Sequence, residues 1–187
     1  SETITDTSGQ YAFGGLYAGT YSIKEIQPTD YIDGKDSLGT VLGQNVGKSN
    51  NDEFEFVNLL EGTEGINYNF GELKPGSISG TVHADINGNC VFEPMNGDRP
   101  LEGVVLELLD GNGLVMESVT TDENGFYAFE NLDPGEYSVR EYTPQGYLDG
   151  GAMPGVINGV TVGQSASGQL NGITLQSGNQ AVNYDFC

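Results

Sequence analysis

The segment TDENGFYAF, residues 121–129, joins a polar turn ending in glycine to an alternating aromatic run, a combination typical of a turn that leads into a β-strand. A closely similar segment, TDTSGQYAF, occupies residues 5–13, so the two copies are offset by 116 residues. A period of 116 residues is the size of an autonomous domain and is too long for a solenoid unit. The sequence therefore predicts tandem domains.

The repeat extends along the chain at the same offset. The further pairs are GTYSIKE (19–25) with GEYSVRE (135–141), YIDG (31–34) with YLDG (147–150), and NYNF (67–70) with NYDF (183–186). We predict an incomplete first repeat over residues 1–72 and a complete repeat over residues 73–187, joined at a short Pro/Gly segment. The first repeat lacks its N-terminal strands, which leaves three alternatives: they lie outside this sequence, a neighbouring chain supplies them, or the half-domain is disordered.

Composition excludes several classes of protein. The 187 residues include 29 glycines, which disfavour long helices, and six Lys and Arg against 27 Asp and Glu, for a net charge of −21. Six scattered basic residues are too few to neutralise a nucleic-acid backbone. No apolar run is long enough to span a membrane. The acidity is typical of a soluble surface, and clustered carboxylates also suit divalent cations.

The complete repeat consists of short alternating or β-branched runs separated by turn signals. Strands are predicted near residues 77–83, 104–109, 114–120, 126–129, 136–142, 159–162, 169–175 and 181–186. This pattern predicts an all-β fold, an antiparallel β-sandwich. The alternating aromatic residues Tyr127, Phe129 and Tyr137 are predicted to lie in its core rather than to form a sugar-stacking platform.

Three linked motifs carry a resemblance to a known family: TDENGFYAF (121–129), LDPGEYSV (132–139) and VREYTPQGY (139–147). They resemble the B-type repeat modules of Gram-positive surface adhesins, above all the B repeats of serine–aspartate repeat adhesins and the B modules of collagen adhesins. The resemblance implies tandem prealbumin-like (Ig-like) β-sandwiches. It also implies an exported stalk or spacer located extracellularly, on the cell surface or secreted.

The segment DINGNCVFE, residues 85–93, places oxygen-bearing side chains at positions 1, 3, 5 and 9, the spacing of an EF-hand-type calcium loop. The predicted ligands are the side chains of Asp85, Asn87, Asn89, Glu93 and Asp98 and the backbone carbonyl of Val91. With three carboxylates at most, those of Asp85, Glu93 and Asp98, the loop is predicted to have modest affinity. It also departs from the usual pattern at two points: Cys90 stands where the loop normally has glycine, and Asp98 stands at position 14 instead of 12. The alternative is an Asx-rich turn that binds only its own backbone.

The two cysteines, Cys90 and Cys187, allow either one disulfide or two free thiols. The adhesin resemblance places the first and last strands side by side, which implies a bridge between these cysteines. The collagen-adhesin modules also carry a Lys–Asn isopeptide bond assisted by a glutamate. In this chain Glu141 and Asn183 match two of those positions, but His83 stands near the expected lysine, so we predict no such bond in the complete repeat.

The resulting functional hypothesis is a non-enzymatic structural stalk or spacer repeat, rigidified by calcium and a disulfide. The lone His83 has no matching Ser and Asp set, which argues against an enzyme. One alternative is an extracellular filament subunit completed by strands from a neighbouring chain. A further alternative is a module that binds carbohydrate or protein. The expected partners are further repeats, other copies of the chain, and cell-surface or matrix components.

Overall fold

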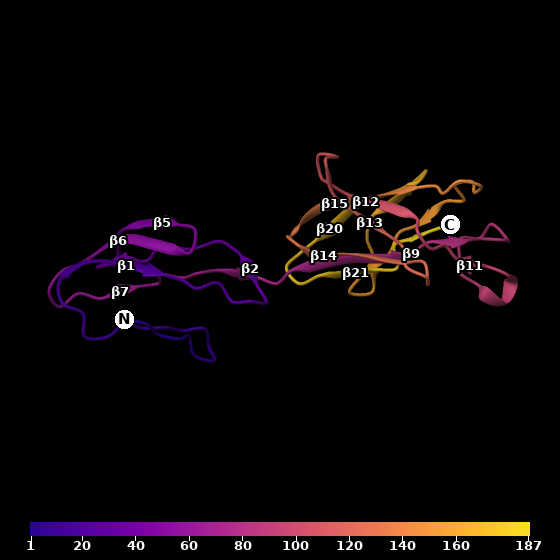
Figure 1. The fold of residues 1–187 in the computed structure, drawn as a ribbon. Helices are drawn as coiled ribbons and strands as arrows, with labels where there is room; N and C mark the ends of the chain where they lie inside the picture. The colour runs from indigo at the N-terminus through magenta and orange to yellow at the C-terminus, as the bar shows by residue number, and fades with distance from the viewer. The chain divides into compact units, whose positions relative to one another are not determined.

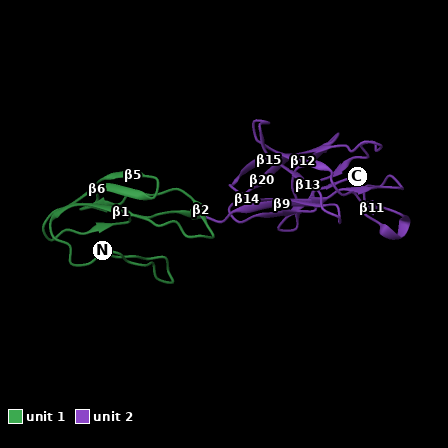
Figure 2. Ribbon diagram, in the orientation of Figure 1, with its two compact units in different colours: residues 1–72 green, residues 73–187 purple.

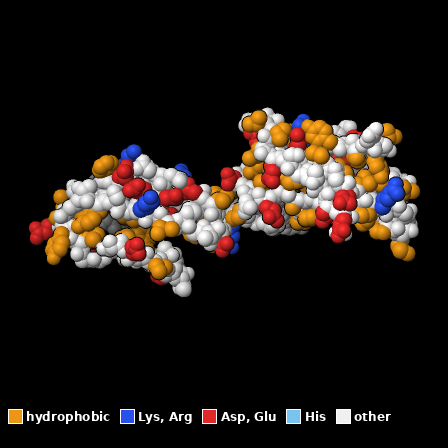
Figure 3. Space-filling view, in the orientation of Figure 1, with side chains coloured by type: hydrophobic (Ala, Val, Ile, Leu, Met, Phe, Trp, Pro, Cys, Tyr) orange, Lys and Arg blue, Asp and Glu red, His pale blue; other side chains and the backbone are white.

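The computed structural model describes residues 1–187, which divide into unit 1, Ser1–Glu72, and unit 2, Leu73–Cys187 (Figure 2). Nearly all regular structure is β, and the one helical element is a single 3₁₀ turn at Pro94–Asn96. No helix of the structure has the length and apolar character needed to span a membrane. On the face drawn in Figure 3, acidic side chains are scattered over both units and basic ones are few.

Unit 2 is built from two five-stranded sheets (Figure 1). The first has the order β13-β12-β15-β20-β19, made of β12 (Val105–Asp110), β13 (Val115–Thr120), β15 (Gly135–Tyr142), β19 (Gln164–Ala166) and β20 (Gln169–Leu175). The second has the order β14-β9-β21-β17-β18, made of β9 (Gly76–Thr81), β14 (Phe126–Leu132), β17 (Val156–Ile157), β18 (Val160–Thr161) and β21 (Gln180–Val182). The β9–β21 pair is parallel, and the other strand pairs of these two sheets are antiparallel.

Two short ladders lie outside these sheets. One pairs β10 (His83–Ala84) with β11 (Arg99–Pro100), and the other pairs β16 (Ala152–Met153) with β22 (Asp185–Phe186). The segment between β10 and β11 contains the predicted calcium loop. Its position between two paired strands fixes both ends of the loop.

Alternation along the strands builds the core of unit 2. In β15 the side chains of Tyr137, Val139 and Glu141 are buried while their neighbours are more exposed, so the period of two places an acid on the buried face. The predicted core aromatics Tyr127 and Phe129 are also buried, which confirms the core prediction. The buried apolar cluster includes Ile78, Val82, Leu106, Leu108, Leu170, Ile173, Tyr184 and Phe186. Each such side chain stabilises the fold by about 1.5–3 kcal/mol.

Unit 1 repeats the second half of this plan. Its ladders are β1-β6-β5 and β4-β3-β7, made of β1 (Gly19–Lys24), β3 (Thr40–Val41), β4 (Gln44–Asn45), β5 (Lys48–Asn50), β6 (Glu53–Leu59) and β7 (Gly65–Ile66). A further ladder pairs β2 (Ile32–Asp33) with β8 (Glu72–Leu73). Strands β1, β3, β4, β5, β6 and β7 align at the 116-residue offset with β15, β17, β18, β19, β20 and β21.

Side-chain hydrogen bonds repeat together with the strands. The Tyr127 hydroxyl donates to the Tyr184 carbonyl at 2.6 Å, and the Tyr11 hydroxyl donates to the Tyr68 carbonyl at 2.6 Å. Even the register shift within β15 has its counterpart in β1. The two repeats therefore share one backbone plan.

The two repeats differ where unit 1 has no counterpart of β9. Residues 126–132 form β14 by pairing with β9, but the corresponding residues 10–16 form no strand. The buried hydrophobic residues of unit 1 are reduced to Val41, Phe54, Val57 and Tyr68, of which the last three form its core cluster. A strand requires a pairing partner, so the same sequence motif adopts a strand only in the complete repeat.

We predict that Gly80→Ala lowers the free energy of unfolding of unit 2 by about 3 kcal/mol or more. A Cβ atom at Gly80 would lie 1.8 Å from the backbone oxygen of Tyr184, so β9 could not keep its close approach to the last strand. Chemical denaturation monitored by tyrosine fluorescence measures the change. The matched control is Gly111→Ala in the β12–β13 turn, where the nearest atom is 3.5 Å away and little change is expected. Equal stability of the two variants would contradict this packing.

Candidate functional site

The predicted calcium loop is organised by the carboxylate of Asp85. Its Oδ1 accepts backbone N–H groups from Asn87 at 3.1 Å and Gly88 at 2.8 Å, and its Oδ2 accepts that of Cys90 at 2.6 Å. These bonds, with that of Cys90 the largest contribution, hold the pKa of Asp85 below its usual value. The first predicted ligand is therefore a charged side chain that shapes the loop.

Two further predicted ligands, Asn87 and Asn89, meet at the carboxylate of a third, Glu93. The Oδ1 atoms of Asn87 and Asn89 accept the backbone N–H groups of Asn89 and Val91, at 3.1 and 2.8 Å. Their Nδ2 groups both donate to Glu93 Oε2 at 2.9 Å. Bonds from Asn89 and then Asn87 lower the pKa of Glu93. The structure thus brings the side chains of positions 3, 5 and 9 together at one point of the loop.

The remaining acid, Asp98, closes the loop from its far end. It is 5% exposed, and its two carboxylate oxygens accept the backbone N–H groups of Ile86 at 2.9 Å and Glu93 at 2.8 Å. The spacing of residues in the sequence could not show that Asp98 closes the loop. The chain reverses at the 3₁₀ turn Pro94–Asn96, and this reversal places Asp98 beside Ile86 at the start of the loop.

The turn geometry of the loop involves both Gly88 and Cys90. Their φ angles are +75° and +56°, so both lie in the left-handed region. That region normally favours glycine, and Cys90 occupies it at the position where the EF-hand-type spacing calls for glycine. Cys90 is joined by a disulfide to Cys187, with the Cα atoms 5.5 Å apart, so this strained residue is held by a covalent bond to the end of the chain after β22.

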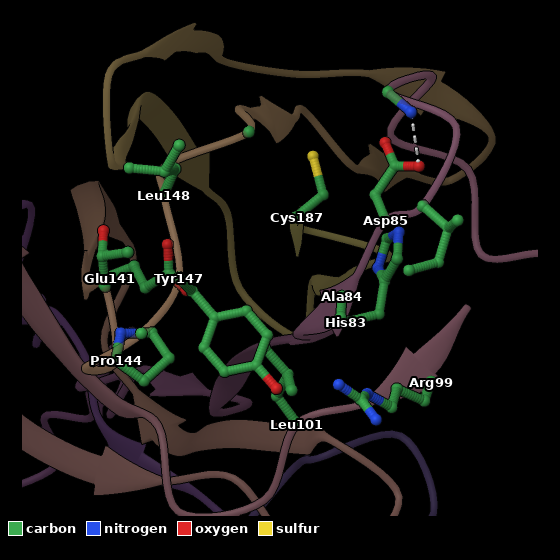
Figure 4. Close-up of a pocket in the computed structure, with 15 residues that line it drawn as sticks. His83, Ala84, Asp85, Arg99, Leu101, Glu141, Pro144, Tyr147, Leu148 and Cys187 are labelled. Carbon is green, nitrogen blue, oxygen red and sulfur yellow. Dashed lines mark hydrogen bonds between the residues drawn. The ribbon is translucent and has the colours of Figure 1, made fainter. Parts of the chain in front are cut away.

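A cavity of about 410 Å³ lies beside the loop, lined by residues of β10, by Glu141 of β15 and by the segment 143–150 (Figure 4). His83 is 2% exposed, and neither of its ring nitrogens has a hydrogen-bond partner. Glu141 is 8% exposed. Burial, with a smaller contribution from Asp149, raises the pKa of Glu141 to about 7. In contrast to the buried His83 and Glu141, the side chain of Asn183 is exposed.

Unit 1 contains a carboxylate cluster that the sequence patterns did not reveal. One oxygen from each of Asp33, Asp36 and Asp52 lies within 4.8 Å of the others. Asp33 and Asp36 are close in sequence, and Asp52 enters only because the β5–β6 hairpin brings it there: its backbone N–H donates to Asp36 at 3.2 Å. The corresponding positions of unit 2 are Asp149, Ala152 and Gly168, so the repeat gave no signal for this cluster.

Comparisons with known proteins agree with this architecture. Residues 76–187 match the family described as SdrD B-like domain. Colossin-A of Dictyostelium discoideum is 37% identical over 149 residues, which are 78% of this chain and 1% of that protein. Serine-aspartate repeat-containing protein D of Staphylococcus aureus is 32% identical over 181 residues, 92% of this chain and 12% of that protein. The chain thus spans a small part of the length of these relatives.

The fold and the motifs define a non-enzymatic structural module, a prealbumin-like β-sandwich of the kind that occurs in repeats. The chain belongs to the SdrD B-like domain family. The resemblance inferred from residues 121–147 is therefore confirmed.

Reduction of the disulfide is expected to lower the free energy of unfolding of unit 2 by about 2–5 kcal/mol, because the bridge closes a long loop in the unfolded chain. Its two cysteines are 97 residues apart in sequence. Denaturation with and without a thiol reductant measures the difference. The double variant Cys90→Ser, Cys187→Ser is the control and should not respond to the reductant. A change below about 1 kcal/mol in the native chain would contradict this role.

The raised pKa of Glu141 predicts a loss of stability as the pH rises. The folded state binds the Glu141 proton more tightly than the unfolded chain does. The resulting stabilisation of unit 2 is fully present below about pH 4.5 and is lost as the pH rises from there to about pH 7. At pH 8, Glu141→Gln should stabilise unit 2 by about 2 kcal/mol, a value reduced because the open cavity admits solvent screening. Thermal melts across this pH range test the prediction. The control is Glu136→Gln, an exposed residue of the same strand; identical pH profiles for the two variants would refute it.

Proposed function

We propose that the chain is a stalk or spacer module of an extracellular surface protein, stiffened by calcium in the loop 85–98 and by the Cys90–Cys187 disulfide. The observation that carries this proposal is that one loop combines both devices: the side chains expected to bind calcium surround a cysteine bonded to the C-terminal residue. A disulfide is also the kind of bond that persists in an oxidising, extracellular compartment.

The residues of the loop fit a hard cation that prefers oxygen ligands. Asn87 and Asn89 each use Oδ1 as a single acceptor in an Asx turn, and Asp85 Oδ2 accepts only the Cys90 N–H, which leaves a lone pair on each of these three oxygens. Glu93 contributes a second carboxylate at the same point. Calcium would supply a bivalent charge that these oxygens share. Asp98 would hold the two ends of the loop, and the disulfide would hold its middle.

The mechanical consequence follows from where the loop is attached. It begins after β10, returns to β11 and is bonded at Cys90 to the end of the last strand. A rigid loop would therefore connect the first and last segments of the sandwich and resist their separation. This proposal assigns the module a role in length and stiffness, with further repeats of the same kind as its neighbours.

A second candidate function is a filament subunit. The observation that favours it is that β1 pairs only with β6, whereas its counterpart β15 pairs with both β12 and β20. A strand supplied by another chain could occupy that edge of β1. Light scattering across a concentration series separates the candidates: the spacer proposal expects a monomer throughout, and growing polymers would favour the filament.

We predict that calcium raises the melting temperature of unit 2. A ligand that binds only the folded state stabilises it by RT ln(1 + [L]/Kd), about 1.4 kcal/mol at ten times Kd, and a site of this kind has a Kd of roughly 10⁻⁴–10⁻³ M. Calorimetry in millimolar calcium against a chelator measures the shift, which Asp85→Asn should abolish.

The matched control is Asp122→Asn, because Asp122 forms an Asx turn with Asn124 and Phe126 outside the loop. That variant should be less stable in both conditions and keep the full calcium shift. Absence of any shift for the native chain would eliminate the calcium part of the proposal and leave the spacer role without it.

A further inference from the structure

The cavity of unit 2 contains a buried group that lacks a partner. Both nitrogens of His83 face no hydrogen-bonding atom, although the side chain is 2% exposed. Buried polar groups in folded proteins are nearly always paired, so an unpaired imidazole in the wall of a cavity of about 410 Å³ points to a polar occupant. Figure 4 shows His83, Arg99 and Tyr147 around this space.

One wall of the cavity is a segment without a strand partner. Residues 147–150 form no strand, and the side chain of Leu148 is 92% exposed. The corresponding residues of unit 1 behave differently, since Ile32–Asp33 form β2 and pair with β8. In unit 1, therefore, the segment that pairs with the residues corresponding to 148–149 is Glu72–Leu73, at the start of the stretch between the two repeats.

The backbone next to residues 32–33 and the backbone next to residues 148–149 make the same hydrogen bond to the end of their repeats. The Gly34 N–H donates to the Gly71 carbonyl at 2.7 Å, and the Gly150 N–H donates to the Cys187 carbonyl at 2.7 Å. In unit 1 the residue after Gly71 is Glu72, whose carboxylate accepts a hydrogen bond from the Gln27 side chain. The acid next to it is Glu25, whose pKa is raised by burial and by Glu72.

The same positions in unit 2 line the cavity. Gln27 and Glu25 correspond at the 116-residue offset to Thr143 and Glu141, and both of these are cavity residues. A segment that follows the path of Glu72 would thus direct its first side chain into the space beside His83. Arg99 lines the same cavity and supplies a cation that complements an acidic side chain.

We propose that this cavity is a docking site for an extended inter-repeat segment of the Gly-Glu-Leu-Lys-Pro type, which pairs with residues 148–149 and places its acidic side chain beside His83 and Arg99. The proposal rests on the repeat array put forward above and names the contact by which one repeat would engage the segment that leads to the next. It adds a backbone pairing and one buried side chain to each junction.

The test compares three versions of the full chain, extended after Cys187 by Glu-Leu-Lys-Pro-Gly, by Ala-Leu-Lys-Pro-Gly or by Gly-Ser-Gly-Ser-Gly. Hydrogen exchange of the amides of residues 148–149 reports the pairing, and the NMR shifts of the His83 ring report entry into the cavity. We expect at least tenfold slower exchange with the first extension than with the Gly-Ser extension. The alanine version should keep part of that protection and lose the His83 shift change.

Equal exchange in the first and the Gly-Ser versions, with unchanged His83 shifts, would overturn the proposal and leave water as the occupant of the cavity. The calcium-dependent melting shift and the monomeric light scattering are measured on the same samples. If those hold while the exchange does not change, the docking inference fails by itself and the spacer function stands.

Discussion

The structure depends on one repeated constraint, a tyrosine hydroxyl bonded to the backbone carbonyl of another tyrosine 57 residues along the chain, buried in unit 2 and half-buried in unit 1. Tyr127 is bonded in this way to Tyr184, and Tyr11 to Tyr68. The second tyrosine of each pair then bonds to a loop carbonyl, that of Val162 or Val46. A buried hydroxyl that loses its partner is costly, so each pair fixes the segment after the polar turn against the end of its repeat. This contact persists in unit 1 even where the strand around Tyr11 is missing.

Much of the fold could be predicted from the sequence because matching segments at a constant offset of 116 residues indicate that both copies form the same strands and turns. The motif at 121–129 predicted a turn into a strand, and the strand forms in unit 2, where β9 provides a partner. It does not form at residues 10–16, since pairing is a tertiary condition that a local motif cannot specify. The Asp33, Asp36 and Asp52 cluster was missed for a related reason: hairpin register, not spacing, brings Asp52 to the other two.

The loop at 85–98 shows where spacing is informative and where it stops. Alternating oxygen side chains are common to an Asx-rich turn and to a calcium loop, so the sequence left both interpretations open. The structure shows the Asx turns and adds two features that spacing could not give: the left-handed conformation of Cys90 and the closure of the loop by Asp98. The disulfide pairing was implied by the adhesin resemblance, and the structure contains it. These features stabilise shape, and none of them assembles a catalytic set.

That one tyrosine-anchored sandwich plan is used twice is tested most directly by native-state hydrogen exchange of Tyr11→Phe and Tyr127→Phe. Each variant loses the hydroxyl bond to the Tyr68 or Tyr184 carbonyl and keeps the ring. We expect each variant to lower protection only within its own unit, by about 1 kcal/mol in both cases. Loss of protection in unit 2 with none in unit 1 would contradict a shared plan.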